Sequence, residues 1–412
     1  MTQHRLAWLD IDLDAVRNNV QTFRQFLKDE AQEKSQESRT VAKTPYLMAV
    51  VKADAYGHGA EQIARAATAA GATWLGVATV DEALRLRAAG IAANILLLSE
   101  PPESALPELI EARVTMTVAT TDFLQTLAGY AMLEHEEISY HLKVDTGMRR
   151  IGVSPDSAIA IARETADMKM LKMDGIFTHF ASADVAKDWE TAQQLERFQG
   201  IIRRLDDIRL RPSIVHCCNT AATLLMPQAH FDMVRVGIGI YGAQPSADTR
   251  GTIELTPAMS VRAQAVQVKP VAMGDGVGYG LTWSAHKPMT LVTLPLGYAD
   301  GIPRLASNKM DVLIDKTGKR IEQVGRVCMD MLMVAADTSD NVKQGDEFVL
   351  MGATRAKNNA ETVRELANTK ALRFGKQEHY ISADELAEYA QTITYELFCG
   401  FGNRLEKIYR NA

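Results

Sequence analysis

The chain has 412 residues, of which 47% are hydrophobic, 6% aromatic and 23% charged. These proportions are those of an ordinary globular protein, and they exclude a disordered, collagen-like or disulfide-framework chain. The formal net charge of −6 offers no basic surplus for nucleic acid or anionic lipid. Because a single core seldom grows beyond roughly 250–300 residues, the length predicts two domains.

The start of the sequence and its cysteines bear on location. Asp10, Asp12 and Asp14 stand where a signal peptide would need an apolar stretch. The longest uncharged run, residues 212–231, contains prolines and histidines, so it does not predict a membrane-spanning helix. The adjacent pair Cys217 and Cys218 does not have the spacing of a structural zinc site. We therefore expect a cytoplasmic protein with no membrane segment and no metal.

The first two-thirds of the chain alternates short apolar runs with alanine-rich helical patterns. Ile63, Ala66, Ala67 and Ala70, for example, recur at helical spacing. The apolar runs predict parallel strands buried on both faces, at residues 46–52, 74–79, 95–99, 114–119, 139–145, 174–180, 213–218 and 233–238. Eight such units predict an α/β fold with a (β/α)8 barrel, since open sheets of this kind usually have six strands.

A barrel of this type places its active site at the carboxyl ends of the strands. We therefore expect the polar residues at those ends to face one site: Lys52, Lys143, Asp145, His179, His216, Asn219 and Arg235.

From about residue 259 the pattern changes to short alternating runs. A phase shift between residues 261 and 268 predicts a bulged strand, and residues 316–319 predict a hairpin turn. A short helix is expected near residues 383–391, whereas residues 28–43 read as an exposed helix end and loop. The predicted domains are a barrel at 12–258 and a mainly β domain at 259–412, which the strand within residues 1–11 joins.

The most specific motif is residues 49–59, Ala-Val-Val-Lys-Ala-Asp-Ala-Tyr-Gly-His-Gly. Burial at a strand end should lower the pKa of Lys52 and make its neutral amine available for covalent chemistry. Taken alone, such a lysine is more often a structural ion-pair partner. The whole string, however, resembles the pyridoxal-phosphate attachment motif of the alanine racemase family (fold type III), in which this lysine binds the cofactor covalently and Tyr56 lies beside it.

The resemblance continues through three further barrel motifs. Residues 141–152 match a motif whose arginine, Arg150, binds cofactor and substrate, and whose lysine, Lys143, is often carbamylated. Without the family, Lys143 and Asp145 would read as a buried pair. The resemblance also implies that His179 stacks on the cofactor ring and that Asn219 and Thr220 bind near its phosphate.

Residues 233–242 follow the last predicted strand, where barrels commonly bind phosphate through backbone N–H groups. Gly237 and Ile238 would supply those groups, and Arg235 resembles the arginine that faces the pyridine nitrogen. An arginine keeps its own proton, so it cannot hold that nitrogen protonated. The ring is then a weaker electron sink, which favours reprotonation at Cα over transamination.

Racemisation needs a proton removed from one face of Cα and delivered to the other, and hence two bases. Residues 276–283 resemble the family's tyrosine motif, which implies Tyr279 as the partner of Lys52. The resemblance also places Tyr298, Met329 and Asp330 near the substrate. In the family these β-domain motifs enter the other subunit's active site in a head-to-tail homodimer.

The motifs span Lys52 to Asp330, but Asn403 stands where many members have a phosphate-binding tyrosine. The expected reaction interconverts L- and D-alanine and supplies D-alanine for peptidoglycan. The alternatives are a broad-specificity racemase acting on serine or basic amino acids, and a vitamin B6 carrier without turnover. A metal-dependent barrel hydrolase using His179, His216, Asp145 and carbamylated Lys143 is a third.

Overall fold

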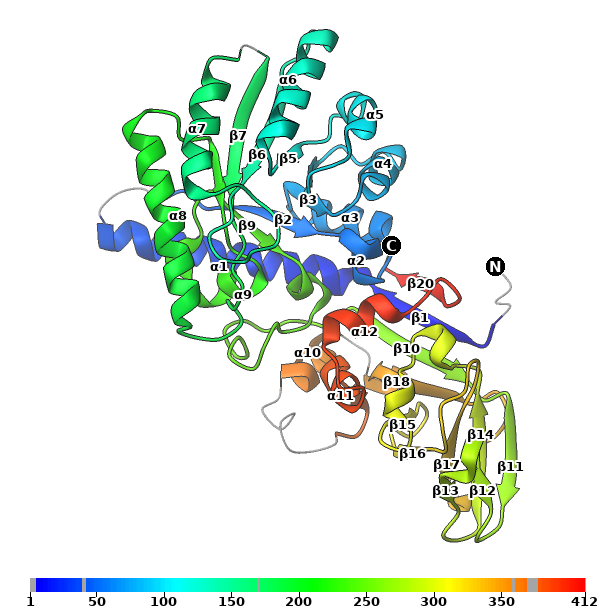
Figure 1. The fold of residues 1–412 in the computed structure, drawn as a ribbon. Coiled ribbons are helices and arrows are strands. Elements are labelled where there is room, and N and C mark those ends of the chain that lie inside the picture. The colour runs from blue at the N-terminus through cyan, green and yellow to red at the C-terminus, as the bar shows by residue number, and fades with distance from the viewer. Residues whose placement is uncertain (1–4, 39–41, 169, 358–359, 369–376, 412) are drawn as a thin grey trace.

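The computed structural model describes residues 5–38, 42–168, 170–357, 360–368 and 377–411 (Figure 1). All eight predicted barrel strands are present. They are β2 (Tyr46–Val50), β3 (Trp74–Val77), β4 (Asn94–Leu97), β5 (Met116–Val118), β6 (Ile138–Lys143), β7 (Leu171–Phe177), β8 (Ile214–His216) and β9 (Met233–Val236). Their side chains are mostly buried, as expected of strands covered on both faces.

The strands form two four-stranded parallel sheets, ordered β4-β3-β2-β9 and β5-β6-β7-β8. A parallel bridge between Leu96 and Thr115 joins them on one side. On the other side the N–H of Arg235 donates to the carbonyl of Cys218 at 3.0 Å. The sheets therefore close into a barrel, and the predicted fold class is confirmed.

Helices surround the barrel, and their caps explain where several begin. Thr79, Thr120, Ser154 and Asp188 each accept a backbone N–H at the helix start, which satisfies one otherwise unpaired donor. The helices are α2 (Lys52–Tyr56), α3 (Ala60–Ala69), α4 (Val80–Ala88), α5 (Leu106–Glu111), α6 (Thr121–Glu134), α7 (Pro155–Ala166), α8 (Trp189–Asp207) and α9 (Thr220–Leu225). None of the helices in the described part of the chain is both long and apolar enough to cross a membrane.

Before the barrel, helix α1 (Leu13–Ser38) differs from the sequence expectation. The helix continues to Ser38, through most of the segment that we expected to be a helix end and loop. Residues 39–41 of that segment lie outside the described residues.

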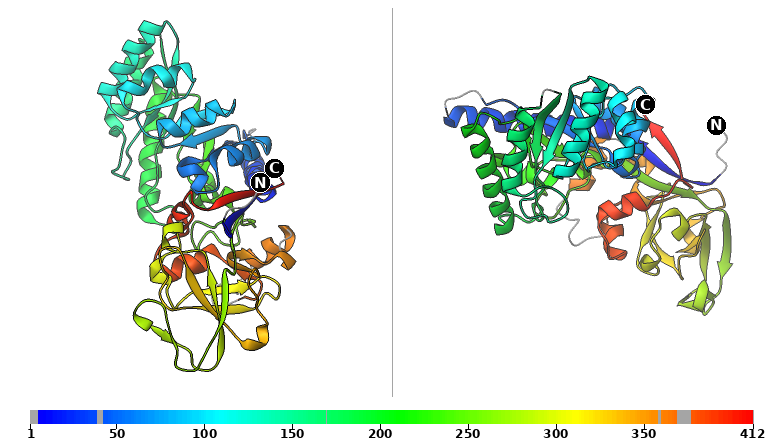
Figure 2. Two further views of the ribbon diagram at one scale, coloured as in Figure 1. Left: turned by 90° about the vertical axis from the view of Figure 1, so that its right-hand side faces the viewer. Right: turned by 45° about the horizontal axis from the view of Figure 1, so that its top comes forward.

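The rest of the chain forms a ten-stranded sheet, in which strands far apart in the sequence are neighbours. Strand β1 (Ala7–Asp12) pairs antiparallel with β10 and parallel with β20, so the first and last strands of the chain lie side by side (Figures 1 and 2). The other strands are β10 (Met259–Gln264), β11 (Gln267–Val271), β14 (Met289–Leu294), β15 (Asp311–Ile314), β16 (Arg320–Val324), β17 (Leu332–Ala336), β18 (Glu347–Ala353), β19 (Tyr380–Ile381) and β20 (Glu406–Arg410). A separate hairpin joins β12 (Gly276–Val277) to β13 (Trp283–Ser284).

The prediction of one continuous strand over residues 261–268 is wrong, although β10 does have a register shift against β18 between Val261 and Arg262. Strand β10 ends at Gln264, and β11 begins at Gln267 and pairs with β14 instead. The phase shift in the sequence therefore marks a break between two strands. The predicted hairpin turn at 316–319 joins β15 to β16, as expected.

Helix α10 (Ala360–Asn368) precedes two further helices in the C-terminal region. The predicted helix near residues 383–391 is α11 (Ala383–Tyr389), whereas α12 (Thr394–Gly400) was not predicted. Helix α12 lies between the barrel and the large sheet (Figure 2). It approaches α2 so closely that a side chain at Gly57 would collide with the carbonyl oxygen of Phe398. This contact brings the C-terminal region to the edge of the barrel site.

Candidate active site

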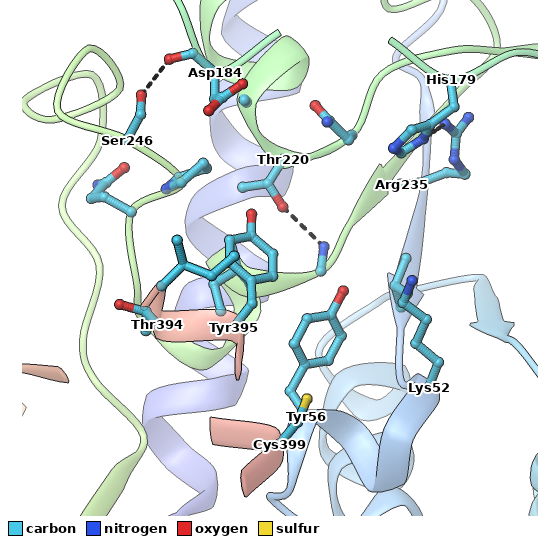
Figure 3. Close-up of a pocket in the computed structure, with 18 of the residues that line it drawn as sticks. Lys52, Tyr56, His179, Asp184, Thr220, Arg235, Ser246, Thr394, Tyr395 and Cys399 are labelled. Atoms are coloured by element: carbon cyan, nitrogen blue, oxygen red, sulfur yellow. Dashed lines mark hydrogen bonds between the residues drawn. The ribbon is translucent and has the colours of Figure 1, made fainter. Parts of the chain in front are cut away.

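A cavity of about 810 Å³ opens at the carboxyl ends of the barrel strands (Figure 3). Its volume is in the range of small-molecule and cofactor sites. Most of the predicted site residues line it: Lys52, Tyr56, Lys143, Arg150, His179, Asn219, Thr220, Arg235, Gly237 and Ile238. Of the strand-end residues expected to face one site, five line this cavity, whereas Asp145 and His216 do not.

The sequence suggested that Lys52 ends a strand. In the structure β2 stops at Val50, and Lys52 is the first residue of α2. The next four residues, 53–56, have φ between 51° and 54°, so α2 is a left-handed turn. This conformation costs about 1–2 kcal/mol for each such residue. Glu82 stabilises it by accepting the N–H of Ala53 at 2.7 Å, and Asp54 accepts that of Ala60 at 2.8 Å. The turn directs both Lys52 and Tyr56 into the cavity.

The two cavity lysines lie in environments that disfavour their charge. Burial, and then the positive charge of Arg150, lower the pKa of Lys52. Burial and Arg235 lower the pKa of Lys143 to about 7. The alternative of a Lys143–Asp145 pair is not observed in the described residues, because Asp145 instead accepts the N–H groups of Gly147 and Arg149. Lys143 can therefore be neutral near physiological pH, and burial favours the neutral amine of Lys52 as well.

Behind the cavity, four largely buried polar side chains are linked in series by hydrogen bonds. Arg235 donates to Nδ1 of His179 at 3.1 Å and to Nδ1 of His216 at 3.0 Å, and His216 bonds to His141 through Nε2 at 2.9 Å. Because a guanidinium can only donate, both Nδ1 atoms must accept, which leaves these two histidines neutral. Burial and Arg235 lower the pKa of both, in agreement. Arg235 itself has a pKa lowered by burial to about 10, so it stays charged.

These hydrogen bonds also argue against the alternative of a metal-dependent hydrolase. A metal ligand needs a free lone pair on the histidine ring, but His216 uses Nδ1 to accept from Arg235 and Nε2 to bond His141. His216 therefore has no ring nitrogen free to bind a metal ion as that reaction would require.

On the opposite wall, polar groups converge near Thr220. Its hydroxyl accepts the N–H of Gly237 at 3.0 Å. A side chain at Gly237 would lie 2.5 Å from the hydroxyl oxygen of Tyr56, so only glycine leaves this space open. A short 3-10 helix begins at Ile238, and the first N–H groups of a helix have no acceptor within it. Hydroxyl and N–H donors around an open space fit the phosphate of pyridoxal phosphate.

The remaining predicted residues lie elsewhere in the chain. Tyr279 is 70% exposed and lines a different cavity of about 730 Å³, which it shares with Met329 and Asp330. The flanking Gly278 and Gly280 have φ of 72° and 73°, so the tyrosine sits in a turn that requires glycine. Tyr298 is 43% exposed and lines neither cavity. Within one chain, these residues do not meet Lys52.

The structure adds residues that the sequence did not indicate. Tyr395 and Cys399, both on α12, line the barrel cavity, whereas Asn403 is exposed and lies outside its lining. Neither α12 residue belongs to a motif that we recognised, and only the packing of α12 against α2 brings them to the site.

A barrel with a desolvated lysine after its first strand and a phosphate cradle after its last defines a pyridoxal-phosphate-binding barrel protein. Two family models match the chain: "Alanine racemase, N-terminal domain" over residues 11–245 and "Alanine racemase, C-terminal domain" over residues 258–374. The protein belongs to the alanine racemase family, whose members depend on pyridoxal phosphate.

Similar proteins extend over nearly the full length. Alanine racemase 1 of Oceanobacillus iheyensis is 38% identical over 99% of both chains, and alanine racemase of Desulfovibrio desulfuricans is 36% identical over 98% of both. Among solved structures, alanine racemase from Streptomyces lavendulae superposes with a TM-score of 0.83 at 33% identity, covering 100% of this chain and 98% of its own. The Bacillus anthracis enzyme with bound L-Ala-P has a TM-score of 0.83 at 32% identity, covering 100% and 97%.

Proposed function

We propose that this protein interconverts L- and D-alanine in a site shared between two subunits. One observation carries the proposal: the cofactor residues line the barrel cavity, whereas Tyr279, Met329 and Asp330 line a separate, exposed cavity of the same chain. The second base is needed at the barrel cavity, but in its own chain Tyr279 lines another cavity. We therefore infer that a partner subunit supplies it.

Within the barrel cavity the residues divide by chemistry. Lys52 would bind the cofactor covalently, and Arg150 would hold the substrate and the cofactor's phenolic oxygen. His179 and Arg235 would contact the ring. The phosphate would be bound by the group around the 3-10 turn, which comprises Tyr56, Asn219, Thr220, Gly237 and Ile238. When bound, pyridoxal phosphate withdraws electrons from Cα of the amino acid and so acidifies its C–H bond.

The protein's own groups then move the proton. The amine of Lys52 serves one face of Cα, and the burial that lowers its pKa favours the neutral form that can accept a proton. The phenol oxygen of the partner's tyrosine at position 279 serves the other face. Arg235 keeps its own proton, because a pKa of about 10 lies well above neutral pH, so it does not transfer a proton to the ring nitrogen. Negative charge would thus stay near Cα, which favours the return of a proton to Cα.

The dimer that we propose is head-to-tail, with the β-domain motifs of each subunit at the barrel site of the other. Met329 and Asp330 then approach the substrate, and Tyr298 lines its entrance. Leu281 and Met331, which are 67% and 47% exposed, flank the Tyr279 region and would be covered in such an interface. We propose the same two domains, a barrel at 12–258 and a mainly β domain at 259–412 with the first strand, and the two family models cover residues 11–245 and 258–374.

We also propose a cytoplasmic role in supplying D-alanine for peptidoglycan. All four cysteines are free, including the buried pair Cys217 and Cys218, as is usual in a reducing compartment.

The direct test is to reduce the purified protein with borohydride and to locate the cofactor by peptide mass spectrometry. We expect the label on Lys52, and we expect Lys52→Ala to lose both the label and racemisation. A label on another lysine would contradict the assignment. Rates for alanine, serine, lysine and arginine decide the substrate: near-equal rates would remove the alanine assignment.

A further inference from the structure

We propose that Glu82 is a positioning residue for Lys52: its carboxylate fixes the left-handed turn that carries the lysine, and its negative charge stabilises the protonated amine. This inference rests on the proposed role of Lys52 as the residue that binds the cofactor and serves one face of Cα. It gives a part in the reaction to a residue that does not line the cavity and belongs to none of the sequence motifs.

The first support is that the Glu82 carboxylate joins two segments of the barrel. Its Oε1 accepts the N–H of Ala53 at 2.7 Å, and Ala53 follows Lys52 directly. Its Oε2 accepts the N–H groups of Ala78 at 2.7 Å and Thr79 at 3.3 Å, which follow β3. Because β3 pairs with β2, one side chain ties the lysine turn to the end of the neighbouring strand.

Glu82 is itself held in place at the start of α4. Its N–H donates to the hydroxyl of Thr79 at 3.3 Å, and the two residues form a capping box. The N-terminus of a helix also attracts negative charge. The carboxylate is therefore restrained on the side of α4 that faces the lysine turn.

The second support is the strain in that turn. Residues 53–56 all have φ between 51° and 54°, which L-residues seldom adopt in succession. Such strain persists only where the surroundings determine the conformation. Within the turn, Ala55 donates to the carbonyl of Val51 at 2.9 Å and Gly57 to that of Ala53 at 3.0 Å. The N–H of Ala53 instead leaves the turn for Glu82, so this contact fixes the turn beside Lys52.

The third support is the charge around the amine. Burial and Arg150 lower the pKa of Lys52, and Arg235 lowers it further. Glu82 raises it, as does the thiol of Cys399 to a smaller extent. Burial raises the pKa of that thiol, so the carboxylate is the negative charge that offsets the arginines. A lysine that takes a proton from Cα becomes a cation, and Glu82 stabilises that form.

The test measures the protonation of Lys52 without the cofactor. The full-length protein, freed of cofactor, is labelled with trace acetic anhydride from about pH 6 to pH 11, and acetylation of residue 52 is quantified by peptide mass spectrometry. Only the neutral amine reacts. Glu82→Gln keeps the size and an acceptor for Ala53 but lacks the charge. We expect its labelling curve to move to lower pH, with a rate at pH 7 roughly 3-fold or more above that of the wild type. A curve that stays in place or moves to higher pH would overturn the inference.

Glu100→Gln is the matched control. Glu100 also holds a loop before a helix, because it accepts the N–H groups of Ala119 at 2.7 Å and Thr120 at 2.9 Å. Its partners follow β5, whereas Lys52 follows β2. The control should leave the labelling curve of Lys52 unchanged. If it moves the curve as far as Glu82→Gln does, the effect is a general loosening and the inference is wrong.

Amide hydrogen exchange in residues 52–57 tests the turn itself. We expect faster exchange in Glu82→Ala, which has no acceptor for Ala53, than in Glu82→Gln. Exchange in Glu82→Ala as slow as in the wild type would contradict the positioning role. If pyridoxal phosphate does not attach to Lys52 of the wild type, the proposed function fails, whatever the labelling shows. If it attaches and the Glu82→Gln curve equals that of the wild type, only the role of Glu82 is wrong.

Discussion

Lys143 is buried between two arginines, Arg150 and Arg235, in a cavity where a third positive charge is unfavourable. Its pKa of about 7 leaves a substantial neutral fraction at neutral pH, and a neutral amine can react with carbon dioxide. The resulting carbamate is negative and would be attracted to both arginines. Carbamylation would thus convert a repulsive arrangement into an attractive one, and we expect it to hold Arg150 in place.

From this follows a dependence on bicarbonate. Enzyme equilibrated in carbon-dioxide-free buffer should lose activity several-fold, and bicarbonate should restore it. Equilibration at pH 6 should also lower activity, because the amine is protonated below its pKa of about 7. Lys143→Gln should not respond to bicarbonate. A wild-type enzyme that is equally indifferent to bicarbonate, with no carbamate mass on residue 143, would count against this role.

Loss of the proposed base Tyr279 should slow proton removal from one enantiomer more than from the other, because a base on one face of Cα removes the proton of one enantiomer. Tyr279→Phe should slow exchange of the Cα proton of L-alanine by about 10²–10⁴-fold, and that of D-alanine far less. Solvent exchange in deuterium oxide under single-turnover conditions measures each rate separately. Equal losses for the two enantiomers would argue against the two-base assignment.

At the level of elements, the sequence located the strands but not their ends. All eight barrel strands were predicted, because runs such as those of β2 and β9 are apolar on both faces. Most predicted strands continued one to three residues too far, as at Val51 and Lys52, because the apolar pattern persists after the ladder has ended.

Two features could not be predicted for different physical reasons. The left-handed turn at residues 53–56 is built from two alanines, an aspartate and a tyrosine; only the aspartate is enriched at positive φ, and one aspartate does not mark a four-residue turn in the sequence. Tyr395 reaches the site only through the packing of α12 on α2, a contact between segments more than 300 residues apart. Local patterns do not encode such contacts.

The left-handed turn also contributes a pH dependence through His58. Its Nδ1 donates to the carbonyl of Tyr56 at 2.8 Å, while Nε2 is buried and has no partner in the described residues. Burial lowers its pKa from 6.5 to about 4. The unfolded chain therefore binds the extra proton between these values, and stability falls as the pH falls.

We expect this residue alone to cost about 2 kcal/mol between pH 7.5 and pH 5, from the difference in proton binding. Urea unfolding at the two pH values measures the loss. His58→Asn retains a donor but cannot titrate, so its loss between the same pH values should be smaller by that amount. A variant that loses as much stability as the wild type would show that His58 is not responsible.

At the scale of the whole molecule, the two bases that we propose lie in places of one chain that do not meet. Lys52 lines the barrel cavity, and Tyr279 lies in an exposed turn of the β region with Met329 and Asp330. A symmetric dimer brings the two together twice, since each subunit gives and receives the same surface. An isolated subunit would bind the cofactor but would lack its second base.

Subunit complementation tests this most directly. Lys52→Ala and Tyr279→Phe are each inactive or nearly so, but a heterodimer of the two has one site with Lys52 and Tyr279 both intact. Random subunit exchange should therefore restore about a quarter of wild-type activity, with heterodimers confirmed by native mass spectrometry. Heterodimers that form yet remain inactive would contradict the account, because both sites would be incomplete only if Tyr279 served its own subunit.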